Sequence, residues 1–479
     1  MNYRPMRRAV ALLAAVGVAG AVLAAQPAAG PQERALAHDI FKELVEINTT
    51  DSVGSTTAAA SAMRKRLLDA GFLPADVVVM GPNDRKGNMV ARYRGRPGST
   101  KKPILIIGHT DVVEAKRSDW SMDPFKFTEK DGYFYGRGTQ DMKESDAIAV
   151  ADFIRLHKEG YVPDRDIILA LTADEENGKS NGVDWLLKNH RELIDADYVL
   201  NPDGGQVRTD KPLAVEFEAA EKMYSDYELS ATNAGGHSSL PIPDNAIYHV
   251  ADALAAIQHY QFPAELNAVT REMYGAMAKI ESGELAADMR AILKEPLDQQ
   301  AAERLSKDAR YNSTLRTTCV ATMLEGGHAP NALPQRAAAN VNCRIFPGHS
   351  QEEIRQALIK VIDDPKVSVR VKNLKGEVTD TEPPRKAMAV PPLRDDVMQA
   401  LRRVSQQMWP GTTVIPIMET GSSDSIYTMS EGLASYGICG VAIDRNDNRM
   451  HGRDERVKAE AFYDGLEFYY LLLKSLTQG

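Results

Sequence analysis

Hydrophobic and polar residues follow the pattern of alternating strands and helices along the first part of this chain. Four short, predominantly apolar runs have the length of strands that are buried in a sheet. These runs are residues 88–93, 104–107, 167–171 and 198–200. Between and before them, apolar residues recur at the spacings of a helix, for example after Pro31 and over residues 146–158. This alternation predicts an α/β fold with a mostly parallel sheet and helices on both of its faces.

From about residue 213 the order of the predicted elements changes. Between residues 214 and 371 we expect strand, helix, strand, strand, helix and strand, which is the order of a split βαβ unit. A charged, Ala-rich helical stretch at about residues 265–307 interrupts this unit. We therefore expect a small α+β domain inserted into a larger one. The expected boundaries are 1–25 for a leader, 32–212 and 386–479 for the two parts of the larger domain, and 213–385 for the inserted domain.

Residues 1–25 have the composition of an export signal. Three arginines precede seventeen uncharged residues, and the stretch ends in small residues at Ala24 and Ala25. Seventeen residues are short for a membrane-spanning helix, which needs ~20. We expect an exported protein, periplasmic or extracellular, without membrane association once the leader is removed; an uncleaved anchor is the alternative.

Composition and charge narrow the range of partners. The chain is 43% hydrophobic with a net charge of −9, so it has no surplus of cations for binding nucleic acid. None of its three cysteines lies in a CxxC motif. Cys319 and Cys343 both fall on predicted strands of the inserted domain, where they are either small core residues or partners in a disulfide.

Histidines and carboxylates follow the predicted strands at the point where each strand ends. These residues are His109 and Asp111, then Asp174, Glu175 and Glu176, then Asp203, and, after a late strand, His451. Asp141 adds a carboxylate in a Gly-rich turn before a helix. Ligands bind at the carboxyl ends of the strands in α/β proteins, and mixed imidazole and carboxylate donors suit zinc and related metals. The donors exceed one tetrahedral shell, which favours two metals ~3.5–4 Å apart with a bridging carboxylate.

Each of these elements alone is weak evidence. Asp111 lies two residues after His109 and is expected to orient its ring, although such a pair is also common in capped turns. Glu175 and Glu176 also fit the solvated start of a helix. The Gly-Arg-Gly sequence before Asp141 lacks the GxGxxG spacing of a phosphate loop. Their order along the chain and their common location at strand ends carry the prediction.

Taken together, these motifs resemble the M20 family of metallopeptidases and aminoacylases. The matching sequences are His109-Thr-Asp111, Gly136-Arg-Gly-x-x-Asp141-Met-Lys, Asp174-Glu-Glu176, Asp203-Gly-Gly, Gly235-Gly-His237-Ser-Ser and His451-Gly-x-Asp-Glu. The resemblance extends from about residue 35 to 475. It implies a di-zinc catalytic domain, with cobalt or manganese also compatible, interrupted by a lid domain that often mediates dimerisation.

The resemblance also implies a role for each residue of the centre. Asp141 bridges both metals, His109 and Asp203 complete the first site, and Glu176 and His451 complete the second. Glu175 is then the general base, which activates the attacking water and passes its proton to the leaving amine. Metal ligation lowers the basicity of a carboxylate, so the base is the neighbour that stays off the metal; such a base adds 10²–10⁴-fold in rate.

Four further residues are implied to act on the substrate. His237, in the lid, reaches the active site, often that of a partner subunit, and stabilises the oxyanion; a surface-loop histidine is the alternative. Asn331 and Arg344 resemble the binders of the substrate carboxylate, although Arg344 also fits an ordinary salt bridge. Gly421 resembles the loop that approaches the substrate backbone.

The resemblance leaves two activities and one remote alternative open. The first is an exopeptidase, of carboxypeptidase or dipeptidase type, that cleaves an amide next to a free carboxylate in a small peptide. The second is an aminoacylase that cleaves N-acyl amino acids. Asp203 resembles the ligand of the short-peptide enzymes, whereas Gly-His-Ser-Ser and the enlarged lid resemble the carboxypeptidase and N-acyl-amino-acid branch. A non-catalytic binding protein on the same scaffold is the remote alternative.

Overall fold

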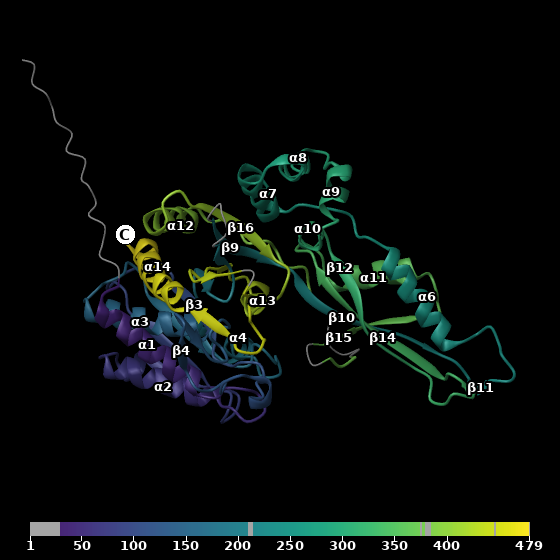
Figure 1. Ribbon diagram of the computed structural model, residues 1–479, viewed down its shortest axis with the longest axis horizontal. Coiled ribbons are helices and arrows are strands. Elements are labelled where there is room, and N and C mark those ends of the chain that lie inside the picture. The colour runs from purple at the N-terminus through teal and green to yellow at the C-terminus, as the bar shows by residue number, and fades with distance from the viewer. Residues whose placement is uncertain (1–28, 209–213, 374–375, 379–384, 445–446, 479) are drawn as a thin grey trace, which may run out of the picture.

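The computed structural model describes residues 29–208, 214–373, 376–378, 385–444 and 447–478 (Figure 1). The expected leader, residues 1–25, lies outside these residues. Figure 1 shows a larger domain with a wide sheet and an elongated inserted domain that extends away from it. None of the described helices combines the length and the apolar character that crossing a membrane requires.

A ten-stranded mixed sheet forms the centre of the larger domain, in the order β1-β2-β6-β3-β7-β17-β9-β8-β18 with β16 paired to β9. The strands from β6 to β17 are parallel to one another, and antiparallel neighbours adjoin them on both sides. The bounds are β1 (Val77–Met80), β2 (Asn88–Tyr93), β3 (Ile104–His109), β6 (Ile167–Thr172), β7 (Tyr198–Asn201), β8 (Gln206–Arg208), β9 (Ala214–Glu221), β16 (Thr413–Glu419), β17 (Ser435–Gly437) and β18 (Ala442–Ile443). The α/β fold class predicted from the sequence is confirmed.

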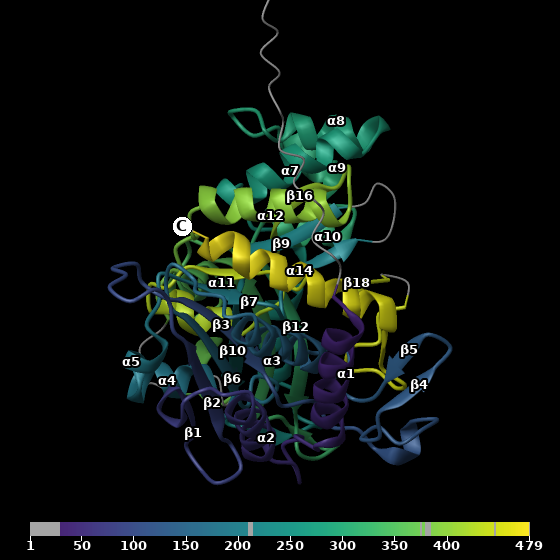
Figure 2. The same cartoon turned by 90° about the vertical axis from the view of Figure 1, so that its left-hand side faces the viewer.

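Helices cover both faces of this sheet because its central strands are apolar on both faces. In β3, Ile104 and Ile106 pack toward one layer of helices, whereas Leu105 and Ile107 pack toward the other. The first layer, seen from the front in Figure 2, contains α1 (Pro31–Glu46), α2 (Thr56–Asp69), α3 (Lys143–Lys158), α12 (Asp395–Met408) and α14 (Ala459–Thr477). The second contains α4 (Gly182–Asn189), α5 (Arg191–Ile194) and α13 (Ser425–Ser430). A small separate sheet joins β4 (Thr128–Lys130), β5 (Tyr133–Tyr135) and β19 (Arg456–Lys458).

The inserted domain is a four-stranded antiparallel sheet in the order β12-β14-β10-β15, with two helices packed against it. Its elements are β10 (Met223–Thr232), α6 (Ala246–His259), β12 (Thr318–Gly326), β14 (Arg336–Ile345), α11 (Gln351–Ile362) and β15 (Ser368–Lys372). This is the strand, helix, strand, strand, helix, strand order expected from the sequence. A short ladder of β11 (Gly236–His237) and β13 (Ala332–Leu333) forms the tip farthest from the larger domain (Figure 1).

The structure differs from the expected domain boundaries at one place. Residue 213 was the expected start of the inserted domain, but β9 pairs with β8 and β16 and so belongs to the sheet of the larger domain. The inserted sheet starts at Met223. An apolar strand alone does not indicate which sheet it joins, because its pairing partner β16 lies about two hundred residues later in the chain.

The helical stretch expected at residues 265–307 is a cluster of four helices, which we call the helical insertion. Its members are α7 (Ala268–Ile280), α8 (Gly283–Ala291), α9 (Gln299–Leu305) and α10 (Ala309–Leu315). Its core includes Ala214 of β9 and Ile415 of β16, so the helical insertion packs on the outer strands of the larger domain. The chain returns to the inserted sheet soon after α10 ends at Leu315, since β12 begins at Thr318.

Two of the three cysteines form a disulfide. Cys319 of β12 and Cys343 of β14 lie directly opposite each other in the antiparallel ladder, with their Cα atoms 4.1 Å apart. Cys439 is buried and free. Of the two readings that the sequence left open, the structure has the disulfide.

This pairing predicts the thiol count of the protein. Denatured without reductant, the chain should expose one reactive thiol, that of Cys439, and after reduction it should expose three. Loop-closure arithmetic gives a loss of about 3 kcal/mol in the free energy of unfolding of the inserted domain in a Cys319→Ser, Cys343→Ser double variant. A thiol titration together with urea unfolding measures both. Three thiols before reduction would contradict the pairing.

Candidate metal centre

The histidines and carboxylates singled out in the sequence gather at one edge of the central sheet. His109 is the last residue of β3, Glu175 and Glu176 follow β6, and Asp203 follows β7. Since β3, β6 and β7 are parallel, their carboxyl ends lie side by side at the same edge. Loops before α3 and after β18 bring Asp141 and His451 to the same place.

Two groups of ligand atoms form there, and Asp141 belongs to both. In the first, donor atoms of His109, Asp141 and Asp203 all lie within 4.8 Å of one another; in the second, those of Asp141, Glu176 and His451 do. One oxygen of Asp141 is 3.0 Å from Nε2 of His109, and the other is 2.9 Å from Nε2 of His451. A carboxylate with one oxygen directed to each group has the geometry of a bridging ligand.

Glu175 belongs to neither group, although it is next to Glu176. Burial raises the pKa of Glu175 well above its usual value; His109 opposes this shift, and the acids Asp203 and Asp424 reinforce it. A carboxyl group that stays off the ligand groups and has a raised pKa is suited to general base and acid work.

Asp111 supports the centre through both its backbone and its side chain. Its backbone carbonyl lies 3.1 Å from Nδ1 of His109, and one of its carboxylate oxygens lies 3.7 Å from the same nitrogen, as expected for a residue that orients the ring. Its carboxylate accepts the backbone N–H groups of Glu175 and Glu176, each at 3.1 Å. Asp111 therefore holds the turn that presents Glu175 and Glu176, a turn that starts with Asp174 in the left-handed conformation (φ 66°).

A buried ion pair that the sequence reasoning missed joins the two loops of the centre. Arg137 donates to Glu455 and to the carbonyl oxygen of Gly452, and Glu455 accepts the backbone N–H of Gln140 at 2.7 Å. Both partners are nearly inaccessible to solvent. The pair thereby fixes the loop of Asp141 against the loop of His451. Arg137 and Glu455 each belong to one of the motifs that resemble the M20 family, and this membership could have indicated their importance.

The candidate centre contains several buried acids whose ionisation requires nearby positive charge. Burial raises the pKa of Asp203 to about 7 and that of Asp424, which accepts hydrogen bonds from Asn181 and Thr172, to about 6. Hydrogen bonds to Asp141 and Glu176 raise the pKa of His451 to about 10. The acids are thus too close together to ionise unless positive charge lies among them, and imidazole with carboxylate donors fits divalent zinc, cobalt or manganese.

The residues expected to bind substrate lie in three different places. His237 and Asn331 are together at the tip of the inserted domain, where the Ser238 N–H donates to the Asn331 carbonyl. Figure 1 shows this tip at the end of the inserted domain away from the larger domain, so one chain does not bring them to the metal ligands. Arg344 lies near the opposite end of β14, with its guanidinium 4.8 Å from the centre of the Tyr224 ring. Gly421 lines a cavity beside Asp203.

Comparison with known protein families supports the interpretation of these residues as a metal centre. Residues 105–475 match the profile of Peptidase family M20/M25/M40. The chain belongs to this family. It is accordingly a metal-dependent hydrolase of the metallopeptidase and amidohydrolase type, as the sequence motifs predicted.

The relatives of this M20 hydrolase are named after several different activities. Probable carboxypeptidase S-like 2 of Dictyostelium discoideum is 28% identical, with 81% of this chain and 74% of that protein covered. The human N-fatty-acyl-amino acid synthase/hydrolase PM20D1 is 25% identical, with 78% and 74% covered. The crystal structure of an M20 family metallo-carboxypeptidase, Sso-CP2 of Sulfolobus solfataricus, has a TM-score of 0.67 at 17% identity, with 92% and 99% covered, and shows the shared fold.

The different positions of Glu175 and Glu176 predict different losses. Glu175→Gln should lower turnover at least 10²-fold while the bound metal stays unchanged, because this side chain is in neither ligand group. Glu176→Gln, the matched control with the same chemical change, should lower metal content together with activity. Elemental analysis and turnover measurements on both variants show which of the two glutamates binds metal. Metal loss in Glu175→Gln with retention in Glu176→Gln would mean that the two roles are exchanged.

Proposed function

We propose that this protein is an exopeptidase, of carboxypeptidase or dipeptidase type, that hydrolyses an amide bond next to a free carboxylate with the help of two divalent metal ions, preferably zinc. The observation that carries the proposal is the division of labour among the carboxylates. Asp141 is shared by two ligand groups, whereas Glu175 adjoins both and belongs to neither. The names of the carboxypeptidase relatives support the peptidase assignment.

The side chains of the centre account for the proton movements of such a reaction. Divalent cations at the two ligand groups would supply Lewis acidity and stabilise negative charge on the substrate oxygen. Glu175 accepts the proton of the attacking water and then donates it to the departing amine nitrogen, which needs the raised pKa that burial gives it. Asp111 keeps Glu175 in place through the hydrogen bond to its backbone N–H.

A second candidate function is the hydrolysis of N-acyl amino acids. A groove of about 240 Å³ between the helical insertion and β16 is lined by Met273, Met277, Tyr311 and Met418. It shares Glu419 with the cavity beside Asp203, so the two hollows adjoin. Charged residues, among them Arg208, Glu216 and Arg310, also line this groove. Its apolar side chains suit an acyl chain, and a human relative is named for fatty-acyl amino acids.

A substrate panel distinguishes the two functions. We expect the metal-loaded protein to cleave dipeptides faster than N-acetyl and N-dodecanoyl amino acids that have the same C-terminal residue, and to lose both activities when a chelator removes the metal. A preference for the acyl substrates that rises with chain length would make the second candidate the main function. Bound metal without cleavage of any member would contradict both and favour a binding role.

We further propose that the protein is a homodimer formed through the inserted domain. β12 is an edge strand, and its apolar residues Val320, Met323 and Leu324 are 59%, 60% and 66% exposed. Tyr248 of the neighbouring α6 is also exposed. An exposed edge strand with apolar side chains is suited to pairing with a second copy of itself. A second copy would also explain how His237, at the remote tip, meets a metal centre.

Dimerisation and site sharing predict two measurable effects. Val320→Glu with Leu324→Glu should halve the mass in solution, whereas Val162→Glu, at an exposed position of the larger domain, should not. Mixing inactive Glu175→Gln chains with His237→Ala chains should restore activity, because half of the sites in a mixed dimer then have both residues. Light scattering and a mixing assay measure these effects. An unchanged mass, or no recovery on mixing, would contradict the proposal.

We also propose that the mature protein is exported to the periplasm or the extracellular space. The composition of residues 1–25 supports this assignment. The Cys319–Cys343 disulfide supports it independently, since disulfides persist in oxidising compartments.

A further inference from the structure

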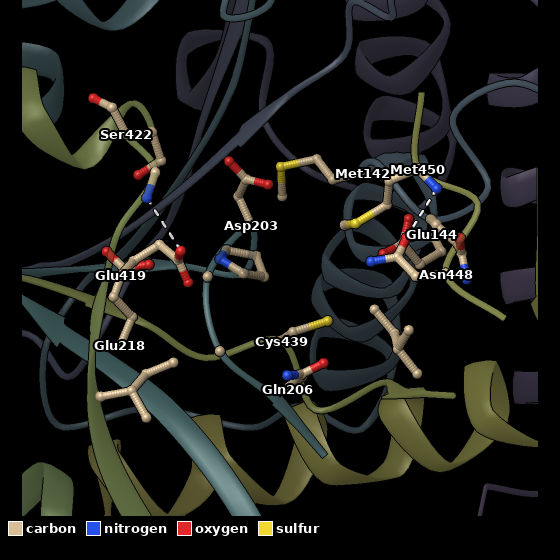
Figure 3. A pocket seen from close by; sticks show the side chains of 18 residues that line it. Met142, Glu144, Asp203, Gln206, Glu218, Glu419, Ser422, Cys439, Asn448 and Met450 are labelled. Carbon is tan, nitrogen blue, oxygen red and sulfur yellow. Dashed lines mark hydrogen bonds between the residues drawn. The ribbon is translucent and has the colours of Figure 1, made fainter. Parts of the chain in front are cut away.

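A cavity of about 370 Å³ lies beside the candidate metal centre. Figure 3 shows its lining, which includes Asp203 of the first ligand group. Three more carboxylates line it: Glu144 from α3, Glu218 from β9 and Glu419 from β16. We call Glu144, Glu218 and Glu419 with the space between them the carboxylate pocket.

The carboxylate pocket contains buried carboxyl groups without a cationic partner. Glu144 and Glu218 are only 2% and 3% exposed. Within the described part of the chain, no Lys or Arg lines the cavity, and none of the three acids forms a salt bridge. One oxygen of Glu144, Oε2, has no hydrogen-bond partner among the described residues. Buried carboxylates are normally paired, so this arrangement indicates a missing cationic partner.

The fold makes room for Glu218 at a specific place. A Cβ atom on Gly204, the residue after Asp203, would collide with Oε2 of Glu218, and one on Gly437 would lie 2.6 Å from its Cβ. These two glycines therefore let the Glu218 side chain approach the turn that holds a metal ligand. Gly421, on the loop expected to meet the substrate backbone, lines the same cavity. The pocket is thus adjacent both to the reaction centre and to the expected path of the substrate.

The spacing of the acids argues for an organic cation and against a third metal ion. Among the described residues, Glu144, Glu218 and Glu419 belong to no group of three donors within 4.8 Å of one another. A metal ion needs its ligands closer than that. A substrate ammonium or guanidinium group has several N–H donors and can reach acceptors that are farther apart.

We propose that the carboxylate pocket is a specificity site that binds a cationic nitrogen of the substrate, either an ammonium or a guanidinium group. The inference rests on the proposed function, since it selects among the substrates of that reaction. Binding of the cation supplies the counter-ion that the three carboxylates lack. The cation can be the side chain of a basic residue or the free α-amino group of a peptide, and the experiment separates these two sources.

Matched substrates test the proposal on the metal-loaded wild-type protein. Dipeptides that have lysine, norleucine or glutamate at either position differ mainly in charge, and N-acetylation removes the α-amino cation from each. We expect kcat/KM for one lysine position to exceed that for norleucine by about 10- to 100-fold, with glutamate lowest. If the α-amino group is the cation, acetylation should cause a loss of similar size and the side chain should matter little.

Glutamine variants assign the preference to the pocket. Glu218→Gln and Glu419→Gln should each lower kcat/KM for the cationic substrate by about tenfold and leave the neutral substrate within about twofold. Asp152→Asn is the matched control, because Asp152 is a buried carboxylate on the same helix as Glu144 but does not line the cavity. It should leave the preference unchanged. Melting curves and metal content identify any variant that fails to fold or loses metal, and the second glutamine variant then provides the test.

The outcomes separate this proposal from the proposed function. Equal cleavage of cationic and neutral substrates by the wild-type protein would overturn the carboxylate pocket as a specificity site and leave the hydrolase assignment intact. Equal losses on both substrates in the glutamine variants would overturn it as well and would indicate a structural role. Cleavage of no panel member by the metal-loaded protein would contradict the proposed function itself.

Discussion

The structure depends most on one electrostatic constraint: acidic side chains are crowded around two imidazoles in a buried place. Asp141 contacts both His109 and His451, while Glu176 and Asp203 complete the two groups. Acids this close and this buried cannot all ionise without compensating positive charge. Burial, reinforced by the neighbouring acids Asp141 and Asp424, raises the pKa of Asp203 to about 7, which expresses that conflict. Divalent cations at the two candidate ligand groups would resolve it, which would couple metal binding to the integrity of this region.

Two kinds of structure hold these groups in place: buried strands of the central sheet, and loops that buried polar contacts join. Parallel strands bring His109 and Asp203 to one sheet edge, and they stay there because the strands are buried on both faces. The remaining ligands are on loops, where rigidity comes from buried polar contacts. Arg137 and Glu455 join the loops of Asp141 and His451, and Asp111 holds the turn of Glu175. The protein itself therefore positions these candidate ligands, as a well-ordered metal centre requires.

Much of this could be predicted from the sequence, and the exceptions have a common cause. The alternation of strands and helices and the residues that end β3, β6 and β7 are local signals, and they indicated the fold class and most of the candidate centre. Pairings between distant segments gave no local signal. The place of β9 in the larger domain depends on β16, and the pairing of Arg137 with Glu455 joins residues more than three hundred positions apart. The carboxylate pocket was missed for the same reason, because Glu144, Glu218 and Glu419 come from three separate elements. The hydrogen bond that the Asp111 backbone carbonyl accepts from the His109 ring was also missed, because side-chain chemistry does not reveal backbone contacts.

The measurement that tests the central claim most directly is anomalous X-ray diffraction from crystals of the protein grown with zinc. The account predicts two anomalous peaks per chain, ~3.5–4 Å apart, one on each side of the Asp141 carboxylate, with Glu175 outside both coordination shells. A single peak, peaks that do not involve Asp141, or direct ligation by Glu175 would contradict it.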